Sequence, residues 1–268
     1  SYFSCRGFKY SGVSQMTIVA ILAVLLIAPT YLNRLRKYPT LFTLVVMLMF
    51  STIVLLELNY ANAENRVRVA VIDTGIDSEL ATPYLCKDGN KDFTGKGMKD
   101  VSGHGTNVAG IISKKINRKI FCLQIIKWYH SGEQVSDEVV SLRLLNSLKQ
   151  ALKFKPRYVN LSMAGYFKSS EEQELLTKLV KNGAKVFVAA GNEGKNLNIE
   201  CDIYPACYDI HSSNYYVIGN YSSSSSNYAN WLKWENGDNV EGFGLVKSGT
   251  SQATAVYLSK QIQKDLYE

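Results

Sequence analysis

The chain has few of the residues that hold metal ions. Its 268 residues include three histidines and five cysteines, and they contain no Cys-x-x-Cys pair and no histidine-rich cluster. Because zinc sites need closely spaced thiolate and imidazole ligands, the sequence does not indicate a zinc protein. We expect neither a bound metal ion nor another cofactor.

The sequence also lacks an arginine-rich stripe and a nucleic-acid-binding motif, although its formal net charge is +7. Residues 1–63 hold five basic residues and one acidic residue, whereas the rest of the chain holds 25 basic and 22 acidic residues. Most of the basic excess therefore belongs to the N-terminal segment. We expect no nucleic-acid partner.

No apolar run reaches the roughly 20 residues that a transmembrane helix usually needs. Two shorter runs, Met16–Ala28 and Leu41–Leu56, flank a loop with three basic residues. Basic loops favour the cytoplasmic side, so the chain after Leu58 is expected outside the cytoplasm. Residues 1–33 could be an upstream extension, a first membrane helix, or a segment before a start at Met16.

The second run is followed by Ala61-Asn62-Ala63, in which small residues flank one position as signal peptidase prefers. Cleavage after Ala63 is favoured over retention as a membrane anchor, and both alternatives stay open. We therefore divide the chain into residues 1–63, a targeting region that acts as signal peptide or anchor, and residues 64–268, a folded domain.

Four of the five cysteines follow residue 63, and an even number suits an oxidising compartment. Cys201 and Cys207 flank Tyr204-Pro205-Ala206, so a local disulfide between them is credible. Cys122 lies in the apolar run 120–126, for which we expect a buried free thiol.

Strand-like and helix-like patterns alternate after residue 66. Apolar runs typical of strands occur at residues 66–72, 120–128, 158–163, 185–190 and 215–218. Helical patterns occur from residue 106 to 112, over 137–154 and 171–181, and at 253–256. Strands that alternate with helices form parallel sheets covered by helices, so we predict an α/β fold.

Four segments surround chemically capable residues with small neighbours. Asp73 follows the first strand, His104 lies between two glycines, Asn192 lies in a Gly-Asn-Glu-Gly turn, and Ser251 precedes an alanine-rich helix. Ordinary structural roles exist for them, such as a turn carboxylate, a turn amide or a helix cap. Together, Asp73, His104 and Ser251 supply the orienting acid, base and nucleophile of a serine hydrolase.

With the order Asp73, His104, Asn192 and Ser251, the chain resembles the subtilisin-like serine proteases from about residue 66 to about residue 259. The resemblance implies a three-layer fold whose mostly parallel, twisted sheet is flanked by helices. It also implies endopeptidase activity through an acyl-enzyme, with Asn192 in the oxyanion hole. The segment that pairs with the substrate backbone in this family corresponds to Ser162, Met163, Ala164 and Gly165.

The chain departs from the family pattern in several places. Gln252 and Ala255 stand where the family usually has Met and Pro, and residues 113–119 are basic where many relatives carry a calcium loop. We expect no calcium there, because clustered cations repel it. No prodomain of ordinary size fits after Ala63, and only 17 residues follow Ser251.

The sequence therefore predicts a serine endopeptidase of minimal size that acts on polypeptides as a monomer. We expect it to be extracytoplasmic, either secreted or attached to the membrane through an uncleaved N-terminal region. The departures leave one alternative from another class: a catalytically weak or inactive protease-like domain that binds peptides, or a truncated remnant. The preferred substrate side chain stays open, since Tyr166 and Phe167 could contact substrate or pack onto the domain.

Overall fold

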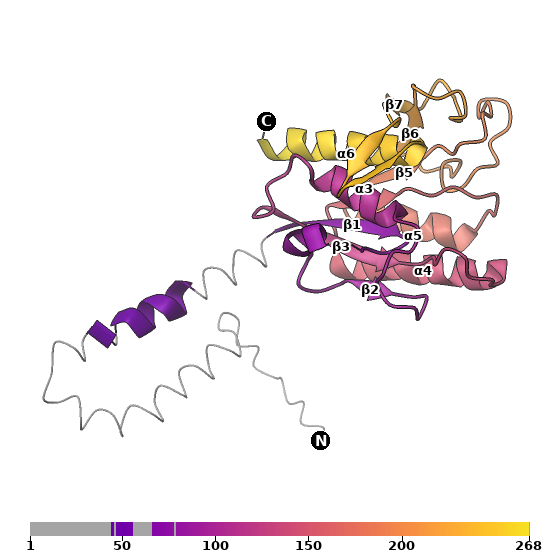
Figure 1. The fold of residues 1–268 in the computed structure, drawn as a ribbon. Coiled ribbons are helices and arrows are strands. Elements are labelled where there is room, and N and C mark those ends of the chain that lie inside the picture. The colour runs from indigo at the N-terminus through magenta and orange to yellow at the C-terminus, as the bar shows by residue number, and fades with distance from the viewer. Residues whose placement is uncertain (1–43, 46, 56–65, 78, 268) are drawn as a thin grey trace, which may run out of the picture. The chain divides into compact units, whose positions relative to one another are not determined.

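The computed structural model describes residues 44–45, 47–55, 66–77 and 79–267 (Figure 1). The chain divides between Asn65 and Arg66 into two units, and the second holds the α/β fold. In the first unit, the described residues between 44 and 55 are helical. The Met16–Ala28 run, the basic loop and the Ala61-Asn62-Ala63 motif lie outside the described residues. No described helix combines the length and apolar composition that a membrane span needs.

A seven-stranded sheet forms the centre of the second unit, in the order β2-β3-β1-β4-β5-β6-β7. Every neighbouring pair in it is parallel, which confirms the predicted sheet. The strands are β1 (Val67–Asp73), β2 (Lys91–Asp92), β3 (Phe121–Lys127), β4 (Tyr158–Leu161), β5 (Lys185–Ala189), β6 (Tyr215–Asn220) and β7 (Lys233–Glu235). A separate antiparallel pair consists of β8 (Val240–Gly242) and β9 (Leu245–Lys247).

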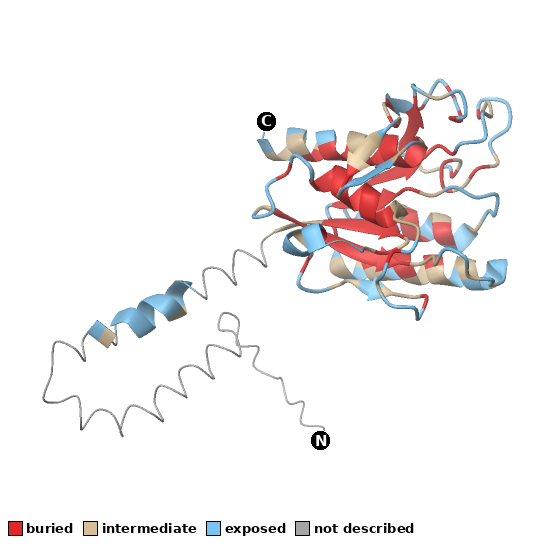
Figure 2. Ribbon diagram, in the orientation of Figure 1, coloured by how far each residue is buried: buried red, intermediate tan, exposed pale blue. Residues whose placement is uncertain are grey.

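Helices cover both faces of this sheet (Figure 1). One face packs against α4 (Asp137–Phe154) and α5 (Ser170–Lys181), and the other against α3 (His104–Ser113) and α6 (Thr250–Tyr267). A 3-10 helix, η1 (Glu79–Tyr84), follows β1. Figure 2 shows buried strands, exposed residues on the outer sides of α4 and α5, and an α3 that is buried almost throughout. The predicted three-layer α/β architecture is confirmed.

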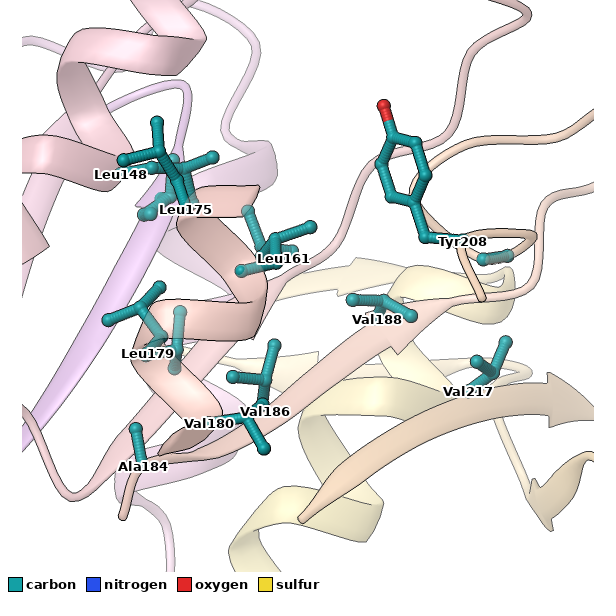
Figure 3. Close-up of a cluster of buried hydrophobic side chains, with 14 of the residues drawn as sticks. Leu148, Leu161, Leu175, Leu179, Val180, Ala184, Val186, Val188, Tyr208 and Val217 are labelled. Atoms are coloured by element: carbon teal, nitrogen blue, oxygen red, sulfur yellow. The ribbon is translucent and has the colours of Figure 1, made fainter. Parts of the chain in front are cut away.

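Alternating side chains of β1 fill the two halves of the core. Ala70 and Ile72 join the cluster under α4 and α5, whereas Val69 and Val71 join the cluster under α3 and α6. Because both faces are covered, the strand is apolar almost throughout. Figure 3 shows the first cluster, in which leucines of α5 lie over aliphatic side chains of β4 and β5.

The helices begin within three residues of the predicted positions. The predicted helix over 137–154 has those limits in the structure. The helix expected from Thr106 begins at His104, directly after Gly103, whose φ of 69° lets the chain turn into the helix. The last helix begins at Thr250 rather than near Ala253, so Ser251 lies in its first turn.

Two disulfides connect the four cysteines of the second unit. Cys201 and Cys207 are bonded, as the sequence allowed. Cys122 is bonded to Cys86, so the expected free thiol was wrong. The two lie 36 residues apart. The parallel bridge between Leu85 and Leu123 brings them together, and no local pattern could show this.

A partly buried polar network fixes the end of α6 against the first residues of β4 and β5. The Asp265 carboxylate accepts hydrogen bonds from the Tyr158 hydroxyl (2.8 Å), the Lys185 ammonium (2.6 Å) and the Gln261 amide (2.8 Å). Burial alone would raise the pKa of Asp265, but hydrogen bonds from Lys185, Tyr158 and Gln261 outweigh it and hold the pKa below its usual range.

We predict that Asp265→Asn lowers the free energy of unfolding by about 1–3 kcal/mol at neutral pH. Since the folded-state pKa lies below the unfolded value of about 3.9, the stabilisation is present above that value. It is lost as the pH falls through the folded-state pKa, so the difference from wild type should shrink in acid. Urea unfolding measured from pH 7 downward tests this.

The control is Glu174→Gln, which removes an exposed ion pair with Lys178 on α5 and should leave unfolding unchanged. A difference between wild type and Asp265→Asn that is independent of pH would contradict the assigned role of the carboxylate.

Candidate active site

The predicted site residues meet at the carboxyl edge of the sheet. Asp73 ends β1, Ser162 follows β4 and Asn192 follows β5. The helices α3 and α6 begin at the same edge with His104 and Ser251 in their first turns. The strand order changes direction between β1 and β4, and such a switch point is where open α/β sheets bind ligands.

Asp73 and His104 form a direct pair. The imidazole Nδ1 lies 2.7 Å from Asp73 Oδ1, and the Thr74 amide donates to the same oxygen at 2.8 Å. An ionised carboxylate only accepts hydrogen bonds, so Nδ1 carries the proton and Nε2 is the basic nitrogen. The charge of Asp73 raises the pKa of His104 above its usual value; burial opposes this shift, and the charge of Asp100 adds to it.

Glycine allows this contact because α3 approaches β1 very closely. A Cβ on Gly105 would lie 2.5 Å from the Gly75 carbonyl oxygen and 3.1 Å from Asp73 Oδ1. A Cβ on Gly103 would lie 2.9 Å from the Leu245 side chain. The glycines around His104 thus make room for other parts of the domain itself.

Asp100 organises the loop that carries His104, and the sequence analysis missed it. Its Oδ1 accepts from Thr74 Oγ1 (2.8 Å), Ser102 Oγ (3.0 Å) and the Gly103 amide (3.0 Å). Its Oδ2 accepts from the amide and hydroxyl of Thr106, both at 2.8 Å. Burial would raise the pKa of Asp100, but these bonds, led by those of Thr106, keep it low. The only sequence signal was a carboxylate one turn before the histidine.

Ser251 and Ser162 are joined by two hydrogen bonds. Ser251 Oγ donates to the Ser162 carbonyl at 3.1 Å, and Ser162 Oγ donates to the Ser251 carbonyl at 3.0 Å. The Asn160 amide in turn donates to Ser162 Oγ at 2.9 Å. The hydroxyl of Ser251 therefore sits at the positive end of the α6 dipole, in contact with the segment that follows β4.

Asn192 is oriented by the start of α6. Its Oδ1 accepts the Thr250 amide at 2.9 Å, which assigns the other amide atom as Nδ2. This is the one side-chain hydrogen bond of Asn192 within the described part of the chain, and the residue is exposed. Asn192 thus has a free donor next to Ser251.

Asn227 holds the turn that carries Asn192 and was also missed. It is fully buried, accepts the amides of Glu193 (3.2 Å) and Lys195 (2.8 Å), and donates to the Ala190 carbonyl (2.8 Å). It lies 35 residues further along the chain, directly after the serine run 222–226, and no local pattern links it to Asn192.

The predicted substrate segment is partly occupied by the domain's own bonds. Gly165 exchanges two backbone hydrogen bonds with Tyr204, at 2.9 and 2.7 Å, and the Ser162 carbonyl receives Ser251 Oγ. The backbone groups of Met163 and Ala164 have no partner among the described residues. The open edge is therefore shorter than the sequence suggested.

Gln252 joins the two helices beside the site. Its amide donates to Asn107 Oδ1 at 3.0 Å, and the Asn107 amide donates to the Val240 and Leu245 carbonyls. A polar bridge thus stands where the family usually has Met. In the described part of the chain, no three His, Cys, Asp or Glu side chains gather as a metal site would require.

Comparison with known proteins finds similar chains among the serine proteases. The model of the subtilase family matches residues 64–257. The chain is 33% identical over 157 residues to the major intracellular serine protease of Bacillus subtilis, covering 53% of this chain and 48% of the relative. It is 29% identical over 157 residues to subtilisin E of the same species, covering 54% and 39%. The chain thus spans about half or less of these curated relatives.

Solved structures agree on the fold. A cold adapted subtilisin-like serine proteinase superposes with a TM-score of 0.58 at 21% identity, covering 74% of this chain and 76% of that one. A lanthipeptide protease gives a TM-score of 0.59 at 18% identity and 75% coverage of each chain.

We predict that His104 titrates above the usual histidine value and that Asp73→Asn lowers its pKa substantially, because the main opposing charge is removed. Asp100→Asn should lower it less. NMR titration of the imidazole Cε1–H, in a Ser251→Ala background that prevents self-cleavage, measures all three. An unchanged His104 pKa in Asp73→Asn would show that the pair does not form in solution.

Proposed function

This chain belongs to the subtilase family, and from that membership we propose that it is a serine endopeptidase with Ser251 as nucleophile, His104 as base and Asp73 as orienting acid. The observation that carries the proposal is the 2.7 Å pair of Asp73 and His104 at the edge where Ser251 begins a helix. The substrates are polypeptides, and the domain acts as a monomer.

In the proposed reaction, Ser251 Oγ attacks the carbonyl carbon of the scissile bond while His104 Nε2 takes the hydroxyl proton. The imidazolium then protonates the leaving amine, and the C–N bond breaks to leave an acyl-enzyme. Water, deprotonated by His104, attacks the ester and restores Ser251. Asp73 stays ionised throughout and stabilises the imidazolium.

Two donors are proposed for the oxyanion that forms during attack: the Asn192 Nδ2 and the Ser251 amide. The Asn192 orientation supports the first, since its Oδ1 already accepts the Thr250 amide. The position of Ser251 in the first turn of α6 supports the second, because such amides have no acceptor within the helix. Donors fixed before the reaction stabilise the developing charge without reorganising.

One observation favours the second candidate, a protease-like domain that binds peptides without cleaving them. The Ser251 hydroxyl donates to the Ser162 carbonyl rather than to His104. Attack requires it to rotate toward the imidazole, and catalytic hydrogen bonds often tighten only when substrate binds. The two candidates therefore differ in whether Ser251 becomes nucleophilic.

A fluorophosphonate probe, which reacts with activated serines, tests the proposal. We expect the folded wild-type domain to incorporate one label and Ser251→Ala to incorporate none. His104→Ala should slow labelling by about 10²–10⁴-fold, the usual contribution of a general base. Mass spectrometry of the intact protein measures the label.

Ser259→Ala is the matched control, because Ser259 lies on the same helix and only donates to the Ile112 carbonyl. It should label like wild type. A folded wild-type domain that stays unlabelled would reject the enzyme and leave the peptide-binding domain.

We further propose that the domain works outside the cytoplasm, either secreted or attached through its N-terminal region. The two disulfides support this compartment, since cytosolic thiols are kept reduced. The basic loop between apolar runs, followed by Ala61-Asn62-Ala63, supports export of what comes after.

We predict that expression in a secreting host releases a soluble form that begins at Glu64. Intact mass and N-terminal sequencing identify the end, and a bulky substitution such as Ala63→Trp should abolish that form because signal peptidase requires small residues. A mature protein that keeps residues before Ala63 and stays with membranes would instead establish the anchored alternative.

A further inference from the structure

A cavity of about 500 Å³ lies against the segment proposed to pair with substrate. Met163, Ala164 and Gly165 form one side of it, and Leu144 of α4 contributes to another. A second cavity of about 510 Å³, around the Cys201–Cys207 loop, is lined by none of the residues 162–165. The first cavity is therefore the one that an extended substrate would pass.

The cavity is lined by a buried acid, Glu172, in the first turn of α5. Ser169 caps this helix by accepting the Glu172 amide at 3.3 Å, and the two form the S-x-x-E pattern of a capping box. In that motif the glutamate returns a bond to the cap residue's amide. Here the Tyr208 hydroxyl takes that place, accepting the Ser169 amide at 2.9 Å and donating to Glu172 Oε2 at 3.0 Å.

Glu172 is only 6% exposed, and the one hydrogen bond that its carboxylate accepts among the described residues comes from Tyr208 and goes to Oε2. In Figure 3 the Tyr208 hydroxyl points away from the labelled aliphatic side chains. Glu172, to which this hydroxyl donates, is one of the residues that line the cavity.

The negative charge of Glu172 is also unmatched. Burial raises its pKa to about 7, and only the hydrogen bond from Tyr208 opposes this. The nearby Lys195 is paired with Asp202 at 2.7 Å, and Lys168 lies over the Tyr204 ring, 5.9 Å from its centre. Neither forms an ion pair with Glu172 among the described contacts. A cation entering the cavity would stabilise the ionised form.

We propose that this cavity binds a lysine or arginine side chain of the polypeptide substrate, with the Glu172 carboxylate as its counter-ion. The proposal rests on the proposed function, since it takes the substrate to run along Ser162–Gly165. The aromatic rings of Trp128 and Tyr204 line the same cavity and favour a cation or its alkyl stem. Asp137, at the start of α4, adds a second negative charge to the lining.

The position of the basic residue follows from the geometry of an extended chain. Ser162 contacts Ser251, and Gly165 lies three residues further along the segment. At about 3.3 Å per residue, the cavity is roughly 10 Å from the nucleophile. The recognised side chain should therefore lie about three residues from the cleaved bond.

Matched peptides test this directly. Once a cleaved sequence is found by mass spectrometry, quenched fluorescent versions carry arginine or citrulline at each position two to five residues from the cut. Citrulline keeps the size of arginine and removes the charge. We expect wild type to show a kcat/KM about 10- to 100-fold higher for arginine at one position. In Glu172→Gln this ratio should fall below about threefold, with citrulline peptides cleaved as by wild type.

Glu171→Gln is the matched control, because Glu171 is the neighbouring residue on α5 and forms an exposed pair with Lys149. It should keep the full preference for arginine. Thermal melts followed by circular dichroism check that each variant is folded. If Glu172→Gln does not fold, the wild-type comparison of arginine with citrulline decides alone.

Failure of this inference can be told from failure of the proposed function. Peptide binding to Ser251→Ala, measured by calorimetry with the same arginine and citrulline pair, needs no turnover. Arginine-selective binding by a domain that takes no serine label would support the cavity and reject the enzyme. Labelling and cleavage without an arginine preference, or a preference that survives Glu172→Gln, would overturn the cavity assignment.

Discussion

The close approach of α3 to the end of β1 is the constraint on which the site depends. Asp73 and His104 come from different layers of the fold and reach 2.7 Å only because Gly105 lies almost against the Gly75 carbonyl. Any side chain at Gly105 would have to displace backbone, and the imidazole with it. The Asp73–His104 pair is thus a consequence of layer packing, and this packing requires that Gly105 has no side chain.

Buried polar residues transmit this constraint to the rest of the edge. Asp100 fixes the loop before His104 with five hydrogen bonds, and Asn227 fixes the turn of Asn192 in the same way. Neither needs to touch substrate to matter. Because a buried carboxylate or amide is costly unless its bonds are satisfied, each holds its loop in one arrangement. Asp100 and Asn227, which are not proposed to react, therefore fix the positions of His104 and Asn192.

Glu172 differs from Asp100 and Asn227 because the domain satisfies its side chain less fully, and this difference indicates a ligand. Asp100 and Glu172 are both buried acids, but the bonds to Asp100 keep its pKa low while burial raises that of Glu172 to about 7. The Asp100 carboxylate accepts five hydrogen bonds from the domain, whereas the Glu172 carboxylate accepts one, from Tyr208. Glu172 is a buried acid with a single hydrogen bond beside the proposed substrate path. It gives the cavity a preference for a positive charge that the aromatic walls alone would not give.

The sequence alone determined the parallel sheet, the order of its strands along the chain and the candidates Asp73, His104, Asn192 and Ser251. These depend on apolar periodicity and on residues within a few positions of one another, which any reader of the chain can see. Tertiary structure alone decided that Cys122 bonds Cys86, that Asn227 holds the turn of Asn192 and that the Tyr208 hydroxyl donates to the Glu172 carboxylate. Those partners are about 30 residues or more apart in the chain, and only the packing of the layers brings them close enough to form these bonds.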